Sequence, residues 1–511
     1  MSHRLPLLNV RVAIAAVATL ASLAAACAGG GGGGGTGPPP PPTSTPTPGN
    51  VATPLVGCPG GPPASVARRP LQTARIMFGK RFPTSSAYRE PYIRGRVAVQ
   101  ISDNASAATS FSRLNARVVA QPNEFGYSSV SIPQSADPAT TAVSLRNQPG
   151  ISDARPIRAL YLQVIPNDPD LGTNSQICTG PQTTFVQWDM YVTWMPEGWG
   201  VTTGSSSIVI GIVDTGVDLT NADVAGKVDH SVVYDLGTGV ADGSASVQDH
   251  DGHGTNVSGI AASVTDNSTR FAGVGWNTHL VEARVFPTPS AGDPNPAAAE
   301  PDIAAGINWA VAHGAKVVNL SLGGAGACDS GPGTVGDAIS AAHAAGVVVV
   351  AASGNDGTNS IDFPGDCPGA LAVGATALDD TTNLAQPKET IASYSNSAPN
   401  TTWGVVAPGG DPSVAQQSCG VSPACDFLQW IINAYSTTAF MDAGTGILIA
   451  GTSQATPHVA GLASLMLAKD GTLTPTQIFS IIESNTDKIV GAGSRQGFGR
   501  INAIKALNAT P

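Results

Sequence analysis

Hydrophobic residues follow two alternating patterns from about residue 205 onward. Uninterrupted apolar, β-branched runs at Ile208–Val213 and Val347–Ala351 predict strands that are buried on both faces. Apolar residues three or four positions apart, as at Ile303, Ile307 and Ala310, predict helices between such strands. The alternation continues with a strand at 316–320, a helix over 335–342 and a strand at 371–374. This order predicts an α/β fold with a mostly parallel central sheet and helices on both faces.

The first residues have the pattern of an export signal. Basic residues within the first eleven positions precede an apolar run from Val12 to Ala26, which is too short for a convincing membrane span. We interpret residues 1–26 as this signal. Cys27 follows Leu23-Ala-Ala-Ala, which resembles a bacterial lipoprotein signal and makes Cys27 a candidate for lipidation. Ordinary cleavage after an Ala-x-Ala sequence is the alternative.

Residues 27–57 are rich in Gly, Pro and Thr and are interpreted as a tether. Seven consecutive glycines and five consecutive prolines occur here, and neither composition can form a core. A lipidated Cys27 with this tether would hold the protein at the cell surface or outer membrane. Without the lipid the chain would be secreted.

A second predicted unit, residues 58–170, precedes a larger domain at 180–511. It has an alternating strand pattern at Tyr92–Ile101, a short helix pattern at 141–148 and another strand pattern at 158–164. These elements predict a small α+β domain. The stretch at 165–170 is polar and contains prolines, so it is expected to be exposed between the two units.

Composition narrows the choice of partners. The chain has 25 Lys and Arg against 36 Asp and Glu and no basic run, which argues against nucleic acid as the main partner.

Besides Cys27 there are six cysteines, and an even number in an exported chain favours disulfides. The chain topology favours three pairs among the fifteen alternatives: Cys328–Cys367, Cys419–Cys425 and Cys58–Cys178.

Residues that can carry chemistry follow several of the predicted strands, at the edge of a parallel sheet where ligand sites lie. Asp214 ends the first strand, and His253 stands between two glycines at a predicted helix start. Ser453 lies at or just before another helix N-terminus, because Pro457 is tolerated only near such a start.

These residue types meet the needs of nucleophilic catalysis. A serine hydroxyl needs a base within hydrogen-bond reach, and histidine can accept its proton near pH 7. A carboxylate behind the histidine fixes its tautomer. Asn355 follows the strand at 347–351, and its amide, with the Ser453 backbone N–H, could stabilise an oxyanion.

Four motifs stand in the order Asp214-Thr-Gly, His253-Gly-Thr, Ser353-Gly-Asn355 and Gly-Thr-Ser453-x-Ala-x-Pro-His-Val-Ala-Gly. This order resembles the subtilisin-like serine proteases, the subtilases of the peptidase S8 family. The resemblance covers about residues 185–508. It implies a subtilisin-like three-layer fold with Asp214 as triad carboxylate, His253 as base, Ser453 as nucleophile and Asn355 as oxyanion donor.

The same resemblance implies further residues and partners. Substrate backbone and the residue before the cleaved bond would contact two segments: Ser321, Leu322, Gly323 and Gly324; and Ala352, Ser353 and Gly354. Residues 58–170 would be an inhibitory propeptide that the enzyme removes itself, by a cut near 160–175. The expected activity is that of an exported serine endopeptidase acting on proteins or peptides through an acyl-enzyme intermediate. It needs no cofactor, and its membrane contact is limited to the N-terminal lipid.

Some alternatives stay open on the sequence alone. Asp223 is either an exposed turn residue or a ligand of a structural calcium ion. The chain between Thr376 and Gly451 is longer than compact subtilases need, which predicts a surface insertion. Asp356, next to Asn355, would favour a basic residue before the cleaved bond. The alternative function is a non-catalytic surface scaffold on the same fold.

Overall fold

The computed structural model describes most of the chain after residue 91. The described residues are 51–54, 92–123, 125–158, 165–168, 171, 187–293, 296–379, 388–411, 430–436, 438 and 447–511. The predicted export signal, Cys27, Cys58, Cys178, Cys419 and Cys425 lie outside them. In these described ranges, no helix is both long and apolar enough to cross a membrane.

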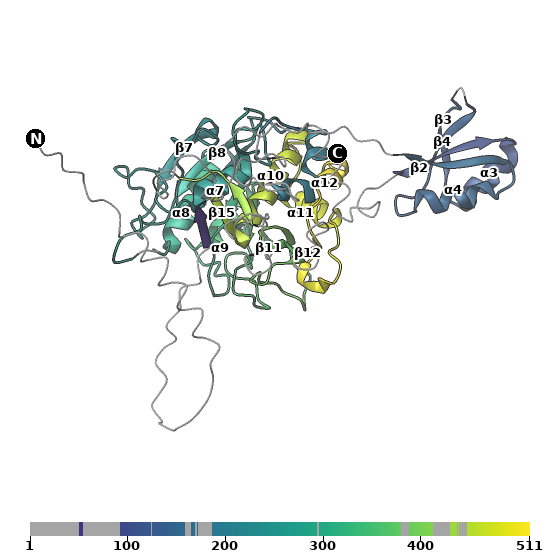
Figure 1. Cartoon of the computed structure of the whole chain (residues 1–511). Helices are drawn as coiled ribbons and strands as arrows, with labels where there is room; N and C mark the ends of the chain where they lie inside the picture. The colour runs from purple at the N-terminus through teal and green to yellow at the C-terminus, as the bar shows by residue number, and fades with distance from the viewer. Residues whose placement is uncertain are drawn as a thin grey trace, which may run out of the picture. The chain divides into compact units, whose positions relative to one another are not determined.

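The larger region is built on an eight-stranded sheet (Figure 1). Its order is β12-β11-β10-β9-β6-β8-β7, with β13 paired to β11, and every pairing is parallel except that of β11 with β12. The strands are β6 (Val209–Asp214), β7 (Val228–Val233), β8 (His279–Arg284), β9 (Ala315–Leu320), β10 (Val348–Ala352), β11 (Ala370–Asp379), β12 (Lys388–Ile391) and β13 (Val405–Pro408). The mostly parallel α/β fold is therefore confirmed, and the predicted strands agree with β6, β9, β10 and β11.

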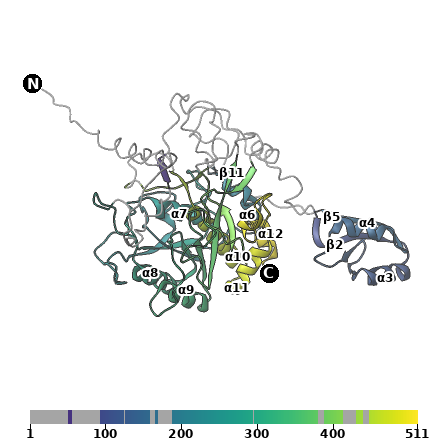
Figure 2. The ribbon, with the colours of Figure 1, turned by 90° about the horizontal axis from the view of Figure 1, so that it is seen from below.

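Helices cover both faces of this sheet because successive strand residues point to opposite sides. In β10, Val348 and Val350 pack with helices α7 and α10, whereas Val349 and Ala351 pack with α8 and α9. Helices α8 and α9 lie side by side (Figure 2). The helices of this region are α5 (Trp188–Val192), α6 (Met195–Trp199), α7 (His253–Ala262), α8 (Glu300–Ala312), α9 (Val335–Ala344), α10 (Thr452–Lys469), α11 (Pro475–Ser484) and α12 (Ala503–Ala509).

The smaller region is a four-stranded antiparallel sheet in the order β3-β4-β2-β5, with two helices. Its elements are β2 (Tyr92–Ile101), α3 (Asn104–Arg113), β3 (Arg117–Ala120), β4 (Tyr127–Ser131), α4 (Pro138–Arg146) and β5 (Ile151–Arg158). The predicted α+β character is confirmed.

Two boundaries in this region differ from the sequence prediction. Helix α4 begins at Pro138, because the Asp137 side chain caps it by accepting the Thr140 N–H. The last strand is β5, which ends at Arg158 where the prediction had it begin; residues 159–164 lie outside the described part. Pro156 is tolerated in β5 because this strand lies at the edge of the sheet.

The part of the chain between Thr376 and Gly451 contributes to the interior. Strand β13 joins the central sheet, and β14 (Ile431–Asn433) pairs with β15 (Ile447–Ala450). All residues of β13 and β14 are buried. The prediction of a surface insertion is therefore wrong for these segments. The third strand of this small sheet is β1 (Val51–Pro54), which lies within the predicted tether and pairs with β15.

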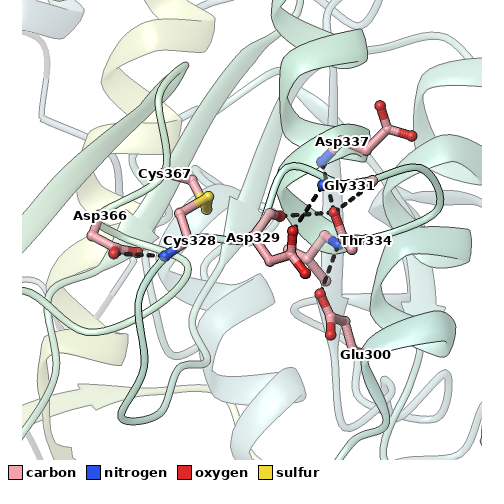
Figure 3. The surroundings of a disulfide bond; sticks show 9 residues. Glu300, Cys328, Asp329, Gly331, Thr334, Asp337, Asp366 and Cys367 are labelled. Carbon is pink, nitrogen blue, oxygen red and sulfur yellow. Dashed lines mark hydrogen bonds between the residues drawn. A yellow bond between two sulfur atoms is a disulfide. The ribbon is translucent and has the colours of Figure 1, made fainter.

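One predicted disulfide lies in the described residues. Cys328 and Cys367 are bonded, and the Asp366 carboxylate accepts the Cys328 N–H at 2.9 Å (Figure 3). Cys328 and Cys367 follow neighbouring strands, as the topological argument required. Within the described ranges, Cys328, Asp366 and Cys367 form the one group of three candidate metal ligands. Because both thiols are consumed by the disulfide, this group is not a metal site.

Candidate active site

Asp214 and His253 come together where β6 ends and α7 begins. His253 Nδ1 lies 2.6 Å from Asp214 Oδ1. Asp214 is the last residue of a strand in the middle of the sheet and is 1% exposed, whereas the His253 side chain is 14% exposed. The carboxylate accepts the Nδ1–H, which leaves Nε2 as the basic nitrogen of the neutral ring.

The charges around His253 favour its protonated form. Burial lowers the pKa of His253, but the charge and hydrogen bond of Asp214 more than offset this effect. Asp251 and Asp249 add smaller contributions of the same sign, and the pKa is raised to about 9. The imidazolium that forms when a base accepts a proton is therefore stabilised at this site.

Asp249, to which the sequence analysis gave no role, organises the loop before His253. It is fully buried, and its two oxygens accept hydrogen bonds from the backbone N–H groups of Asp251, Gly252 and Thr255. They also accept the hydroxyls of Thr215 and Thr255. Asp249 thus ties the residue after Asp214 to the first turn of α7. The sequence could have indicated this role, because Asp249 is an acidic residue four positions before His253 in the same motif.

Ser453 is the second residue of α10 and is 5% exposed. A helical carbonyl normally accepts the N–H four residues ahead, but Pro457 has none to give to Ser453. The Ser321 hydroxyl occupies that position and donates to the Ser453 carbonyl at 2.7 Å. Asn319 Nδ2 in turn donates to Ser321 Oγ at 2.9 Å. The end of β9 therefore fixes the first turn of the Ser453 helix.

Asn355 is oriented by the residue next to Ser453. The backbone N–H and the hydroxyl of Thr452 both donate to Asn355 Oδ1, each at 2.9 Å. A backbone N–H can only donate, so the atom facing Thr452 is the amide oxygen. The Asn355 NH₂ group is therefore on the opposite side of the amide and is available as a donor. Thr452 is a second residue that the sequence analysis missed.

The contacts join the candidate residues in two groups. Asp214 is bonded to His253, while Ser453 is connected to Ser321 directly and to Asn355 through Thr452. Helices α7 and α10, which carry His253 and Ser453, pack against each other. Within the described residues, His253 Nε2 is buried and has no hydrogen-bond partner. Such catalytic contacts are often long before a substrate binds.

The two candidate substrate-binding segments leave the same edge of the sheet. Residues 321–324 follow β9, and residues 352–354 end β10 and continue beyond it. These strands are adjacent and parallel, so the segments face each other beyond their carboxyl ends. The Ser353 hydroxyl donates to the Asn396 carbonyl, and the Asn396 N–H donates to the Gly354 carbonyl. Asn396 therefore holds the second segment in place.

Asp223 is buried, so its interpretation as an exposed turn residue is wrong. It is 2% exposed and lies near a second buried carboxylate, Asp168, which is 3% exposed. Asn267 links them: its side-chain N–H donates to Asp223, and its backbone N–H approaches Asp168 at 3.4 Å. The Asn267 amide turns its nitrogen to Asp223, while its oxygen accepts the Thr269 N–H. The two buried carboxylates are therefore the groups here that could ligate a hard cation such as Ca²⁺.

Asp168 also corrects the expectation that 165–170 is an exposed stretch. Pro166, Asp168 and Leu171 are buried. The Asp266 N–H donates to Asp168 Oδ2 at 2.8 Å, so this segment packs on the larger region. The polar residues of this segment suggested exposure. Asp168 can nevertheless be buried, because backbone N–H groups donate hydrogen bonds to its carboxylate.

Comparison with protein families gives two matches. Residues 205–500 match the subtilase family, and residues 81–156 match the fervidolysin N-terminal prodomain. The first match spans the central sheet and helices α7 to α11. The second covers most of the four-stranded sheet.

Individual relatives agree with these matches. A thermophilic serine proteinase from Bacillus sp. (strain AK1) is 33% identical over 420 residues, which are 81% of this chain and 88% of the relative. Thermitase from Thermoactinomyces vulgaris is 34% identical over 312 residues, covering 61% of this chain and 92% of thermitase. Among solved structures, a protease from Pseudoalteromonas arctica PAMC 21717 is 28% identical with a TM-score of 0.52. That alignment covers 68% of this chain and 99% of the protease.

The family match includes Asp214, His253, Asn355 and Ser453. The alignment with the Bacillus sp. relative is longer than this match and covers 81% of the chain. Subtilases need no cofactor for catalysis. The chain therefore belongs to the subtilase family and is a subtilisin-like serine endopeptidase with an N-terminal prodomain.

Proposed function

We propose that the enzyme cleaves peptide bonds with Ser453 as nucleophile, His253 as base and Asp214 as its partner. The short contact between His253 Nδ1 and Asp214 Oδ1 carries this proposal. It holds the ring in the tautomer whose Nε2 accepts the Ser453 proton during attack on the substrate carbonyl. The same proton then passes to the leaving amine. Water, activated by the same nitrogen, hydrolyses the acyl-enzyme in the second half of the reaction.

Asn355 stabilises the oxyanion that forms during each half-reaction. Its amide oxygen is held by Thr452, so its NH₂ group is fixed before substrate arrives and needs no reorientation. The Ser453 backbone N–H, at the start of α10, is the second donor. Thr452 thus holds one donor by hydrogen bonds, and the adjacent Ser453 supplies both the other donor and the nucleophile.

The decisive experiment compares the wild type with Ser453→Ala. A fluorophosphonate probe, which reacts with an activated serine, should label the wild type after prodomain removal and should not label the variant. Deleting one oxygen is sterically mild, so a matched circular-dichroism spectrum serves as the folding control. A wild-type protein that stays unlabelled would refute the catalytic proposal.

The N-terminal parts control where and when this activity appears. We propose that residues 58–170 contain an intramolecular inhibitor that the enzyme itself removes. We place the cut upstream of Ile165, because Ile165, Asp168 and Leu171 pack on the larger region. The signal and tether would export the protein and hold it through a lipidated Cys27. Replacing Cys27 with Ser should then release the enzyme from the membrane fraction.

The pair Asp168 and Asp223 is proposed to hold a structural calcium ion. Carboxylate oxygens from both would be its ligands. The ion would offset the repulsion between two buried negative charges. It would also fasten the segment that follows the prodomain to the loop after α7. Its role is in stability, since it lies outside the catalytic residues.

A further inference from the structure

Asp362, a carboxylate that the proposed mechanism does not use, lies between the two substrate-binding segments. It is 8% exposed. Its N–H donates to the Ser353 carbonyl at 3.0 Å, and the next residue, Phe363, accepts the Gly324 N–H at 2.8 Å. The chain at Asp362 therefore bridges residues 321–324 and residues 352–354. The space that these two segments and Asp362 border is called the slot below.

The Asp362 side chain packs against glycines of both segments. A Cβ placed on Gly354 would lie 2.2 Å from Asp362 Oδ2, and one placed on Gly323 would lie 3.8 Å from Asp362 Cβ. Gly354 has a φ of 106°, which residues with side chains rarely adopt. The carboxylate therefore lies directly against Gly354, the residue before the oxyanion donor Asn355.

Among the described residues, Asp362 forms a hydrogen bond with a neutral side chain and an ion pair with none. Asn396 Nδ2 donates to Oδ1 at 2.9 Å. In the described part of the chain, no Lys, Arg or His forms an ion pair with it. Burial, and then the charges of Asp356 and Asp366, raise the pKa of Asp362 to about 6, while the Asn396 hydrogen bond opposes them. At neutral pH a nearly buried negative charge thus lacks a counterion, which is unfavourable unless a ligand supplies one.

The position of Asp362 determines which part of a substrate can supply this cation. The carbonyl under attack lies beside Asn355, so the side chain of the residue that bears this carbonyl enters the adjacent slot. We propose that Asp362 selects substrates with Lys or Arg immediately before the cleaved bond, through a charge-assisted hydrogen bond to Oδ2. This inference rests on the proposed function. It also replaces Asp356 as the selecting residue, because Asp356 is exposed.

The test uses three peptides that differ only in the residue before the cleaved bond: Lys, norleucine or Phe. Norleucine is close to Lys in length and lacks the ammonium group, so the Lys-to-norleucine ratio of kcat/KM isolates the charge. For the wild-type enzyme, produced as the full chain and allowed to mature, we expect a ratio of at least about tenfold. A ratio near one would overturn the inference without any variant.

Asp362→Asn supplies the second measurement. Asn keeps the size of Asp and an oxygen that can accept the Asn396 N–H, but it removes the negative charge. The Lys-to-norleucine ratio should fall at least about tenfold, while kcat/KM for Phe changes less than about threefold. Asp366→Asn is the matched control, because Asp366 is exposed and bonds to Cys328. An unchanged ratio in Asp362→Asn, or an equal fall in both variants, would overturn the inference.

Fluorophosphonate labelling separates this test from that of the catalytic proposal. An enzyme that is labelled but cleaves the three peptides equally would refute selection by Asp362 and leave the catalytic residues in place. A wild-type protein that is not labelled would refute the catalytic proposal, and the inferred selectivity with it.

Discussion

The two folded regions of this chain differ in the size of their cores. The prodomain sheet at 92–158 has one cluster of ten buried hydrophobic residues, whereas two much larger clusters cover both faces of the central sheet. Large apolar residues are exposed in both regions, including Phe125 at 69% in the prodomain and Val490 at 91% in the larger region. Stability increases with the fraction of surface that a domain buries. We therefore expect the prodomain to be the part that is lost and the peptidase domain to be the part that persists.

The largest expected effect concerns cleavage between the two regions. In Ser453→Ala, the chain should keep both regions after signal removal, whereas the wild type should be shortened upstream of Ile165. Loss of the nucleophile lowers the rate by on the order of 10⁶ in comparable proteases, so no residual processing is expected. Intact mass and N-terminal sequencing give the lengths. Equal lengths for both proteins would exclude self-processing.

A matched pair of cavity variants tests the difference in stability. Leu145 in α4 and Leu462 in α10 are both fully buried, and replacing either with Ala should destabilise its own region by about 2–5 kcal/mol. A domain as small as the prodomain has a free energy of unfolding of roughly that size, so Leu145→Ala should unfold it. Leu462→Ala should lower the melting temperature of the peptidase domain and leave it folded.

These variants are best made in the Ser453→Ala background, where both regions stay on one chain. Calorimetry should then show two transitions, of which Leu145→Ala removes the first and Leu462→Ala shifts only the second. If Leu145→Ala left both transitions in place, the predicted marginal stability of the prodomain would be wrong.

Calcium removal should affect the peptidase domain alone. At a calcium concentration about 100-fold above Kd, binding contributes about 2.7 kcal/mol to its stability. Chelation should therefore lower the second transition by roughly 5–10 °C and leave the first unchanged. Asp223→Asn should melt at the chelated temperature with or without added calcium. A wild-type protein that is indifferent to both calcium and chelator would exclude the proposed site.

The last prediction is a pH dependence that originates in the larger region. Only neutral His253 can accept the Ser453 proton, and the pKa of His253 is raised to about 9. Below that pKa, kcat/KM for a neutral peptide should rise about tenfold per pH unit and should level off above it. The pKa of His253 is high because the charge and the hydrogen bond of Asp214 favour the protonated ring. A plateau that already begins near pH 6.5 would contradict this assignment.

The sequence predicted most of the sheet and the candidate catalytic residues for clear physical reasons. Buried parallel strands such as β6 and β10 are continuous apolar runs, and Asp214, His253 and Ser453 stand at element ends that the pattern locates. The extent of β5 could not be predicted from the sequence, because Ile151 and Ala154 are its only buried hydrophobic residues among the described side chains.

Buried polar residues were the other failure, because polarity by itself suggests exposure. Asp168 and Asp362 are placed by backbone N–H and amide groups that come from distant parts of the chain. Local patterns of hydrophobicity carry no information about such long-range contacts. The same reasoning explains why Asp223 was assigned to the surface.

The two glycines that contact Asp362 constrain how this enzyme could acquire new substrates during evolution. Side chains at Gly323 or Gly354 would collide with the Phe363 carbonyl or the Asp362 carboxylate, so neither wall can readily be altered by substitution. Position 362 already carries a side chain, so a residue of similar size can replace Asp362 without such a collision. Divergence of substrate preference among descendants of this protein would therefore concentrate at that position, while both glycines would stay invariant.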